Sequence, residues 1–147
     1  MKRLFDFVTA TMLVILLAVP MLLVVVVVRL TSKGPALYWS DRVGRFNVIF
    51  KMPKFRTMKL NTPEMATHLM NTPDTFLSPL GGFLRRSSLD EIPQLWSILK
   101  GDMSFVGPRP PITYSPYEFK DYPVRAKKRF NVLPGLTGLS QINGRNS

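Results

Sequence analysis

The hydrophobic residues of this chain are concentrated near its N-terminus. Residues 7–28 contain two polar side chains, Thr9 and Thr11, and are otherwise apolar. As one helix this run would measure about 33 Å at about 1.5 Å per residue, which is long enough to cross a bilayer core of about 30 Å. Pro20 would break it into arms of about 20 Å and 12 Å, and neither arm crosses the core alone. The pattern therefore predicts a membrane helix that either spans or enters one leaflet and returns.

Cationic residues lie on both sides of the apolar run. Lys2 and Arg3 precede it, and Arg29 and Lys33 follow it. Cationic flanks prefer the cytoplasmic side of a membrane, and if both flanks lie there the segment enters one leaflet, bends at Pro20 and returns. Re-entry leaves backbone groups at the bend that need partners in lipid, so the residues alone favour a spanning helix with its N-terminus outside, and the re-entrant helix is the alternative. A cleaved signal peptide is disfavoured because no small-residue cleavage site precedes the continued apolar run.

The polar part of the chain, residues 31–147, consists of short periodic stretches separated by proline and glycine. Strands are predicted at 36–39 and 48–51, and tight turns at 44–47 and 134–138. Helices are predicted at 64–70, 78–86, 90–100 and within 114–129. The fold class is therefore α+β, a mostly helical small cytosolic domain with short strands behind a membrane helix at residues 1–30.

Two adjacent carboxylates lie at the start of the helix that ends at Gly101. Ser88 and Glu91 fit a capping box, but that frame places Pro93 where a helical hydrogen bond would be lost. With Asp90 as the N-cap, Pro93 falls in the first turn and costs no bond, so we prefer Asp90 at or near the cap. Both carboxylates then have a structural explanation as cap and dipole partner. The same geometry would also let a carboxylate bind Mg²⁺ or attack phosphorus.

Composition adds a strong positive charge. The chain has 20 Lys and Arg against 9 Asp and Glu, a formal net charge of +11, and no Cys. Such a field attracts anionic lipid, nucleotide phosphates or nucleic acid. Nucleic acid is disfavoured because no helix-turn-helix, zinc-knuckle or RNP-like pattern is present. The absence of Cys excludes disulfides and thiolate metal sites, and the lone His68 is interpreted as a surface residue.

Several cations are candidates for anion binding. Alternation would place Lys54, Arg56 and Met58 on one face of an extended segment, which could equally be a solvated basic edge. Arg85 and Arg86 end the predicted helix 78–86, where cations also complement the helix dipole.

A second group of candidates follows Gly101. Pro108 and Pro110 stiffen the backbone on either side of Arg109, which suits a clamp for phosphate oxygens, although a proline-rich connector is the alternative. The basic residues of 125–129 beside Phe130 suit an anionic headgroup layer or a solvated face.

Five motifs occur in order along the polar part of the chain. They are Lys54-Phe55-Arg56-Thr57-Met58, the block from Leu84-Arg85-Arg86 to Leu89-Asp90-Glu91-Ile92-Pro93-Gln94-Leu95, Leu99-Lys100-Gly101-Asp102-Met103-Ser104, Gly107-Pro108-Arg109-Pro110 and Pro134-Gly135-Leu136-Thr137-Gly138. Each motif alone is weak, but five in order behind an apolar segment are highly specific. From Met1 to Asn146 the chain resembles the bacterial sugar transferases, the monotopic phosphoglycosyl transferases.

The resemblance implies transfer of a sugar 1-phosphate from a UDP-sugar to a polyprenyl phosphate, with release of UMP, as the first step of glycan assembly such as that of exopolysaccharide. It implies that Asp90 is the nucleophile of a covalent phosphosugar intermediate and that Glu91 assists, with Mg²⁺ held at both. The substrate-binding residues are expected to be Lys54, Arg56, Arg85, Pro108 and Arg109. A non-enzymatic basic module that docks on membrane surfaces is the alternative function.

The resemblance also implies a location. It places a re-entrant helix, broken at Pro20, in the bacterial inner membrane among phospholipids, with residues 31–147 on the cytoplasmic face as the catalytic domain. Val19 replaces a Ser that many small members have before this proline. Family chains usually continue for some tens of residues beyond Ser147, so we expect a C-terminally truncated domain. A homodimer, the sugar, the polyprenol length and the glycan stay open.

Overall fold

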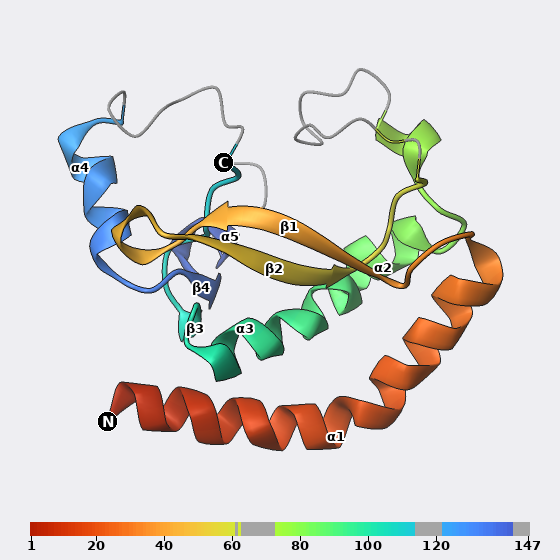
Figure 1. The fold of residues 1–147 in the computed structure, drawn as a ribbon, viewed down its shortest axis with the longest axis horizontal. Coiled ribbons are helices and arrows are strands. Elements are labelled where there is room, and N and C mark those ends of the chain that lie inside the picture. The colour runs from red at the N-terminus through yellow and green to blue at the C-terminus, as the bar shows by residue number, and fades with distance from the viewer. Residues whose placement is uncertain (61, 63–72, 114–121, 143–147) are drawn as a thin grey trace.

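The computed structural model describes residues 1–60, 62, 73–113 and 122–142. The predicted helix at 64–70, with His68, lies outside the described residues, as do residues 114–121 of the last predicted helix. Figure 1 shows a long N-terminal helix beneath a small domain of short helices and two small sheets. The mixed α+β class predicted from the sequence is confirmed.

The N-terminal helix α1 runs from Lys2 to Thr31 as one continuous element with Pro20 inside it. It is long and apolar enough to cross a membrane by length and composition. Pro20 has no N–H to donate to the preceding turn and its ring crowds that turn, so a bend is the expected result. Figure 1 shows α1 bending part-way along its length, so the helix bends without separating into two.

The domain packs on both parts of α1. In the first part, Ala10 contacts a core that includes Leu95 and Ile98 of α3 (Leu95–Lys100). In the last part, Val28 packs with Ala36 and Leu84 in a second cluster. Helix α1 therefore lies along the domain rather than projecting from it (Figure 1).

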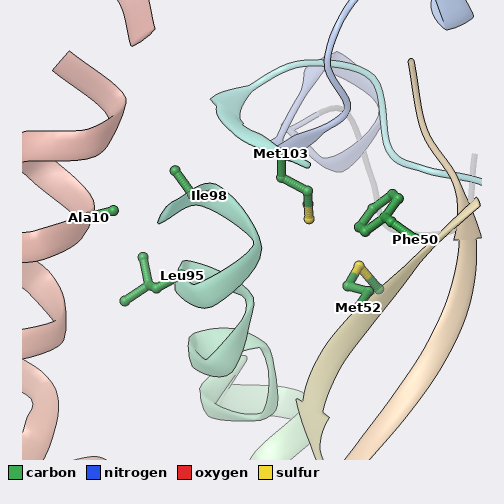
Figure 2. Close-up of a cluster of buried hydrophobic side chains, with 6 residues drawn as sticks. All are labelled: Ala10, Phe50, Met52, Leu95, Ile98 and Met103. Atoms are coloured by element: carbon green, nitrogen blue, oxygen red, sulfur yellow. The ribbon is translucent and has the colours of Figure 1, made fainter. Parts of the chain in front are cut away.

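Helix α3 forms the middle layer of the main core. Figure 2 shows Leu95 and Ile98 on the side of α1, and Met103, Phe50 and Met52 on the side of the hairpin. Burial of these apolar side chains is the main favourable term that holds the layers together.

The hairpin is formed by β1 (Leu37–Val43) and β2 (Ile49–Phe55), which pair antiparallel from Leu37 opposite Phe55 to Val43 opposite Ile49. Both strands were predicted, and both are longer than predicted. Strand β1 continues to Val43 and includes Asp41, which forms a cross-strand ion pair with Lys51, and β2 continues to Phe55. The connection contains the 3₁₀ turn η1 (Arg45–Asn47).

The second sheet pairs β3 (Ser104–Val106) parallel with β4 (Gly135–Thr137). The tight turn predicted at 134–138 is therefore wrong. A Cβ on Gly135 would lie 2.1 Å from the backbone nitrogen of Gly107. Glycine is needed there for close approach of two backbones rather than for a turn.

The carboxylate pair lies in a 3₁₀ helix, η4 (Leu89–Gln94), which precedes α3 and follows α2 (Gly81–Ser87). The predicted cap at Asp90 is wrong, and the capping box does not form. Ser88 adopts a left-handed conformation with φ 59° and its N–H closes α2 on the Arg85 carbonyl, so it cannot adopt the extended N-cap geometry. Gly101 ends α3 as predicted, with φ 98°.

Helix α2 begins three residues later than the predicted start at Ser78, because residues 78–81 form a turn in which the Gly81 N–H donates to the Ser78 carbonyl. The described part of the predicted helix within 114–129 is two short elements, α4 and η6. The remaining elements are η3 (Pro73–Phe76), α4 (Val124–Lys127), η6 (Lys128–Asn131) and α5 (Leu139–Ile142).

Candidate active site

The first turn of η4 packs against β2 and brings the acidic pair to a cluster of cations. One carboxylate oxygen of Glu91, Oε1, accepts hydrogen bonds from Lys54 Nζ and Arg109 Nη2, each at 3.0 Å. Lys54 comes from β2 and Arg109 from the proline-rich loop after β3. Three residues predicted from separate motifs therefore meet at a single atom.

Asp90 lies beside this ion-pair cluster and is 8% exposed. Burial raises the pKa of the Asp90 carboxyl, and neighbouring Glu91 adds to the rise. The positive charges of Lys54 and Arg85 offset part of this increase in the pKa. The pKa of Asp90 is therefore raised overall despite these two cations.

Glu91 has the opposite character. Burial alone would raise its pKa, but the cations Lys54 and Arg109 outweigh burial and hold the Glu91 pKa below its usual range. Burial also lowers the pKa of Lys54, which Glu91 partly counteracts. Since the environments push the pKa values of Asp90 and Glu91 apart, the two carboxylates can have different roles. Glu91 is hydrogen-bonded to two cations, Lys54 and Arg109.

The side chains of the other two predicted cations, Arg85 and Arg56, contact different parts of the protein. Arg85, in the last turn of α2, donates from Nε to the Thr57 hydroxyl at 3.0 Å, and its charge acts on Asp90. Arg56 is buried and donates from Nη2 to the carbonyl and hydroxyl oxygens of Ser32, just after α1. The structure therefore brings Arg85 to the site and directs Arg56 toward the end of the apolar helix.

The loop that carries Arg109 is in contact with two arginines that the sequence analysis did not assign to the site. Arg42 Nη1 donates to the Pro110 carbonyl at 3.2 Å, and Arg129 Nη2 donates to the Arg109 carbonyl at 2.6 Å. Pro108 precedes Arg109 in this loop and lines a narrow pocket with it. Arg42 and Arg129 lie far from this loop in the sequence, so no local motif predicts their contacts with it.

A bound metal ion needs several ligand atoms from the protein or its substrate. Among the described residues there is no group of three or more His, Cys, Asp or Glu that could hold one. Mg²⁺, however, is commonly bound by one or two carboxylates together with substrate phosphates and water. Asp90 and Glu91 are consecutive residues of η4 and would supply two such carboxylates, although Glu91 Oε1 is already bonded to Lys54 and Arg109.

A buried Asp90 and a partly buried Glu91, surrounded by cations in a domain that packs on a long apolar helix, have the features of an enzyme that transfers phosphate esters next to an apolar surface. The sequence matches the family described as bacterial sugar transferase across residues 1–147, and the chain belongs to that family. The resemblance drawn from the five motifs is thereby confirmed.

Curated relatives cover nearly all of the chain. It is 38% identical to the undecaprenyl-phosphate galactose phosphotransferase of Salmonella typhimurium over 99% of this chain and 33% of that protein. It is 35% identical to the UDP-glucose:undecaprenyl-phosphate glucose-1-phosphate transferase of Escherichia coli over 98% of this chain and 31% of that protein. The uncharacterized sugar transferase EpsL of Bacillus subtilis is 40% identical over 100% of this chain and 70% of its own length. The chain thus spans about a third of the first two relatives.

Proposed function

We propose that this chain transfers a sugar 1-phosphate from a UDP-sugar to a polyprenyl phosphate and releases UMP. The observation that carries the proposal is the buried Asp90 beside a Glu91 oxygen shared by Lys54 and Arg109. Family membership and the printed activities of the Salmonella and Escherichia relatives support the same reaction.

The reaction has two displacement steps. In the first, an Asp90 carboxylate oxygen attacks the phosphorus that bears the sugar. An Asp90–phosphorus bond forms, the bond from that phosphorus to the bridging oxygen breaks, and UMP leaves with the electron pair. In the second, an oxygen of the polyprenyl phosphate attacks the same phosphorus and Asp90 leaves as a carboxylate. A soluble donor and a lipid acceptor can thus use one site in turn.

The cations around Asp90 reduce the electrostatic repulsion that opposes the first step. A carboxylate nucleophile is repelled by a diphosphate, and fixed positive groups offset this repulsion without reorganising during the reaction. Lys54 and Arg109 are held in place by Glu91, and Arg85 by Thr57. Mg²⁺ held by Asp90 and Glu91 would add a charge that neutralises the phosphate oxygens.

We propose that α1 enters and leaves the cytoplasmic leaflet of the bacterial inner membrane. Near its start, Lys2 Nζ donates to the Val106 carbonyl at 3.0 Å, and the Asp6 carboxylate accepts from the Ser104 hydroxyl at 2.8 Å. Near its end, Val28 is buried against the same domain. Contacts at both ends of the helix support a topology with both ends on one side of the membrane.

The side chains of α1 that face away from the domain suit a lipid environment, which in this topology would be phospholipid. Exposed apolar residues continue along the whole helix. They are Leu4, Phe5, Phe7, Val8, Met12, Ile15, Leu16, Val19, Leu22, Leu23, Val26, Val27 and Leu30.

UMP release tests the function directly. Detergent-solubilised protein with Mg²⁺ and undecaprenyl phosphate should release UMP from UDP-glucose, UDP-galactose or another UDP-sugar of a panel. Asp90→Asn should abolish release because the amide cannot act as the nucleophile, and donor labelled in the sugar should no longer become attached to the protein. Release by Asp90→Asn within tenfold of wild type would falsify the nucleophilic role. Wild-type protein without release from any UDP-sugar would refute the transferase and leave the membrane-surface module.

A further inference from the structure

The loop that presents Arg109 has few backbone hydrogen-bond donors of its own. Three of its residues, Pro108, Pro110 and Pro111, have no backbone N–H to donate. Its carbonyl oxygens nevertheless require partners where they are buried. The loop must therefore be held by donors from other elements.

Four consecutive carbonyls of this loop accept hydrogen bonds from outside it. The donors are Gly135 N to Pro108 O at 3.0 Å, Arg129 Nη2 to Arg109 O at 2.6 Å, Arg42 Nη1 to Pro110 O at 3.2 Å and Val43 N to Pro111 O at 3.0 Å. Two of these donors are backbone groups and two are guanidinium groups. Of the two guanidinium groups, that of Arg129 binds the residue whose own side chain contacts Glu91.

We propose that Arg129 is a positioning residue for the transfer reaction, because it holds the main-chain oxygen of Arg109 and thereby sets the Arg109 guanidinium against Glu91. A charged donor makes a stronger hydrogen bond to a carbonyl than a neutral donor does. Its partner also has a defined place, since prolines flank Arg109 and limit backbone rotation on either side. The inference rests on the proposed function of Arg109 as a phosphate clamp.

The surroundings of Arg129 distinguish it from the exposed cations Arg125 and Lys128 near it in sequence. Its guanidinium carbon lies 6.0 Å from the ring centre of Phe130, which is buried and packs edge-on against Tyr122. Arg125 and Lys128 are exposed, whereas Arg129 is only partly exposed. The headgroup role considered for the whole 125–129 segment therefore does not describe Arg129, which lines the same narrow pocket as Arg109.

The test compares Arg129→Ala with Arg125→Ala, a matched removal of an exposed arginine from the same region. Arg129→Ala should lower kcat/KM for the UDP-sugar by about ten- to a hundredfold, the range for losing a group that orients a functional side chain. Arg125→Ala should stay within about twofold, as for most surface substitutions. Equal activities of the two variants would overturn the proposal.

A double-mutant cycle separates positioning from a general structural role. In an Arg109→Ala background, Arg129→Ala should cause little further loss, because its effect passes through a side chain that is already gone. The same fold-loss in both backgrounds would contradict the proposal. If Arg129→Ala lowers the melting temperature strongly, the cycle uses Arg129→Lys instead, which keeps the charge but lacks the planar guanidinium. Arg129→Lys should likewise cause little further loss of activity in the Arg109→Ala background.

The controls also distinguish this inference from the proposed function. Wild-type protein that releases no UMP would refute the transferase, and the positioning role with it. Wild-type protein that is active while Arg129→Ala matches Arg125→Ala would refute the positioning role alone.

Discussion

Replacing Glu91 with glutamine should destabilise the protein through the cations that it leaves behind. The Lys54 and Glu91 side chains are 16% and 19% exposed, so removing the carboxylate leaves a largely buried ammonium without its counter-ion. Breaking a buried pair in this way costs about 3–5 kcal/mol, and the residual exposure of this pair favours the lower end, about 3 kcal/mol. Arg109 is 42% exposed, and its separate contribution is screened to below about 1 kcal/mol.

The free energy of unfolding, measured by tryptophan fluorescence in denaturant, gives the comparison. Asp41→Asn is the matched control, because it breaks an ion pair with Lys51 of the same 3.0 Å length whose side chains are 46% and 68% exposed. That control should cost less than about 1 kcal/mol. If Glu91→Gln destabilises the protein no more than Asp41→Asn, the buried-pair reasoning is wrong.

The pH dependence adds a signed test of the same idea. The pKa of Lys54 in the folded protein is lowered by burial, and Glu91 is the group that opposes this. Without Glu91, the pKa of Lys54 in the folded protein should fall further. The positive charge of Lys54 then opposes folding, and this cost is fully present at pH values below the Lys54 pKa of the folded protein. The difference in stability between wild type and Glu91→Gln should therefore narrow as pH rises and Lys54 loses its proton. A difference that widens with pH would contradict this sign.

Two further predictions follow from the pKa of Asp90 and from the contacts of α1. Because burial raises the pKa of Asp90 above its ordinary 3.8, its charge opposes folding at neutral pH, and Asp90→Asn in metal-free buffer should be at least as stable as wild type there. That advantage should disappear below pH 3.8, where Asp90 is protonated in both states; a loss of stability at pH 7 would be inconsistent with the raised pKa. Single cysteines at positions 2 and 33, in a chain without native cysteine, should both resist a membrane-impermeant maleimide in intact cells and react after lysis. Labelling at position 2 before lysis would establish a spanning helix.

The parts of the site that sequence could predict are those in which a short motif dictates local geometry. Gly101 ends α3 because it adopts a positive φ, and alternation along β2 gives Lys54 a face distinct from that of buried Phe55. Prolines beside Arg109 indicate a stiff loop whatever its neighbours. In such motifs, a few neighbouring residues determine the local backbone geometry, so the sequence alone predicts it.

The parts that sequence could not predict depend on partners far along the chain. In the sequence, Gly135 has the pattern of a turn residue. The structure shows instead that it approaches the backbone of Gly107 closely and belongs to strand β4. Arg129 belongs to a basic run that suits a membrane surface equally well, and its bond to the Arg109 carbonyl appears only in the folded protein. The helical segment begins at Leu89 rather than with a cap at Asp90, because the left-handed Ser88 closes the preceding helix.

The polar residues at the start of α1 illustrate the same limit for membrane topology. From sequence, Lys2 and Arg3 are flanking charges that could favour either a re-entrant or a spanning helix. In the fold they donate to carbonyls of the domain, Lys2 to Val106 and Arg3 to Ile98 and Leu99. Their charges therefore interact with the protein as well as with any membrane surface.

Asp6 strengthens this argument because its side chain faces the domain and is 2% exposed, whereas the exposed side of α1 carries apolar side chains. Its carboxylate accepts from the Ser104 hydroxyl and from the Phe105 N–H, and moving it into lipid would break both bonds and bury a charge without a partner. Hydropathy alone cannot reveal this constraint, since Ser104 lies 98 residues away. We therefore expect the start of α1 to stay on the domain's side of the membrane.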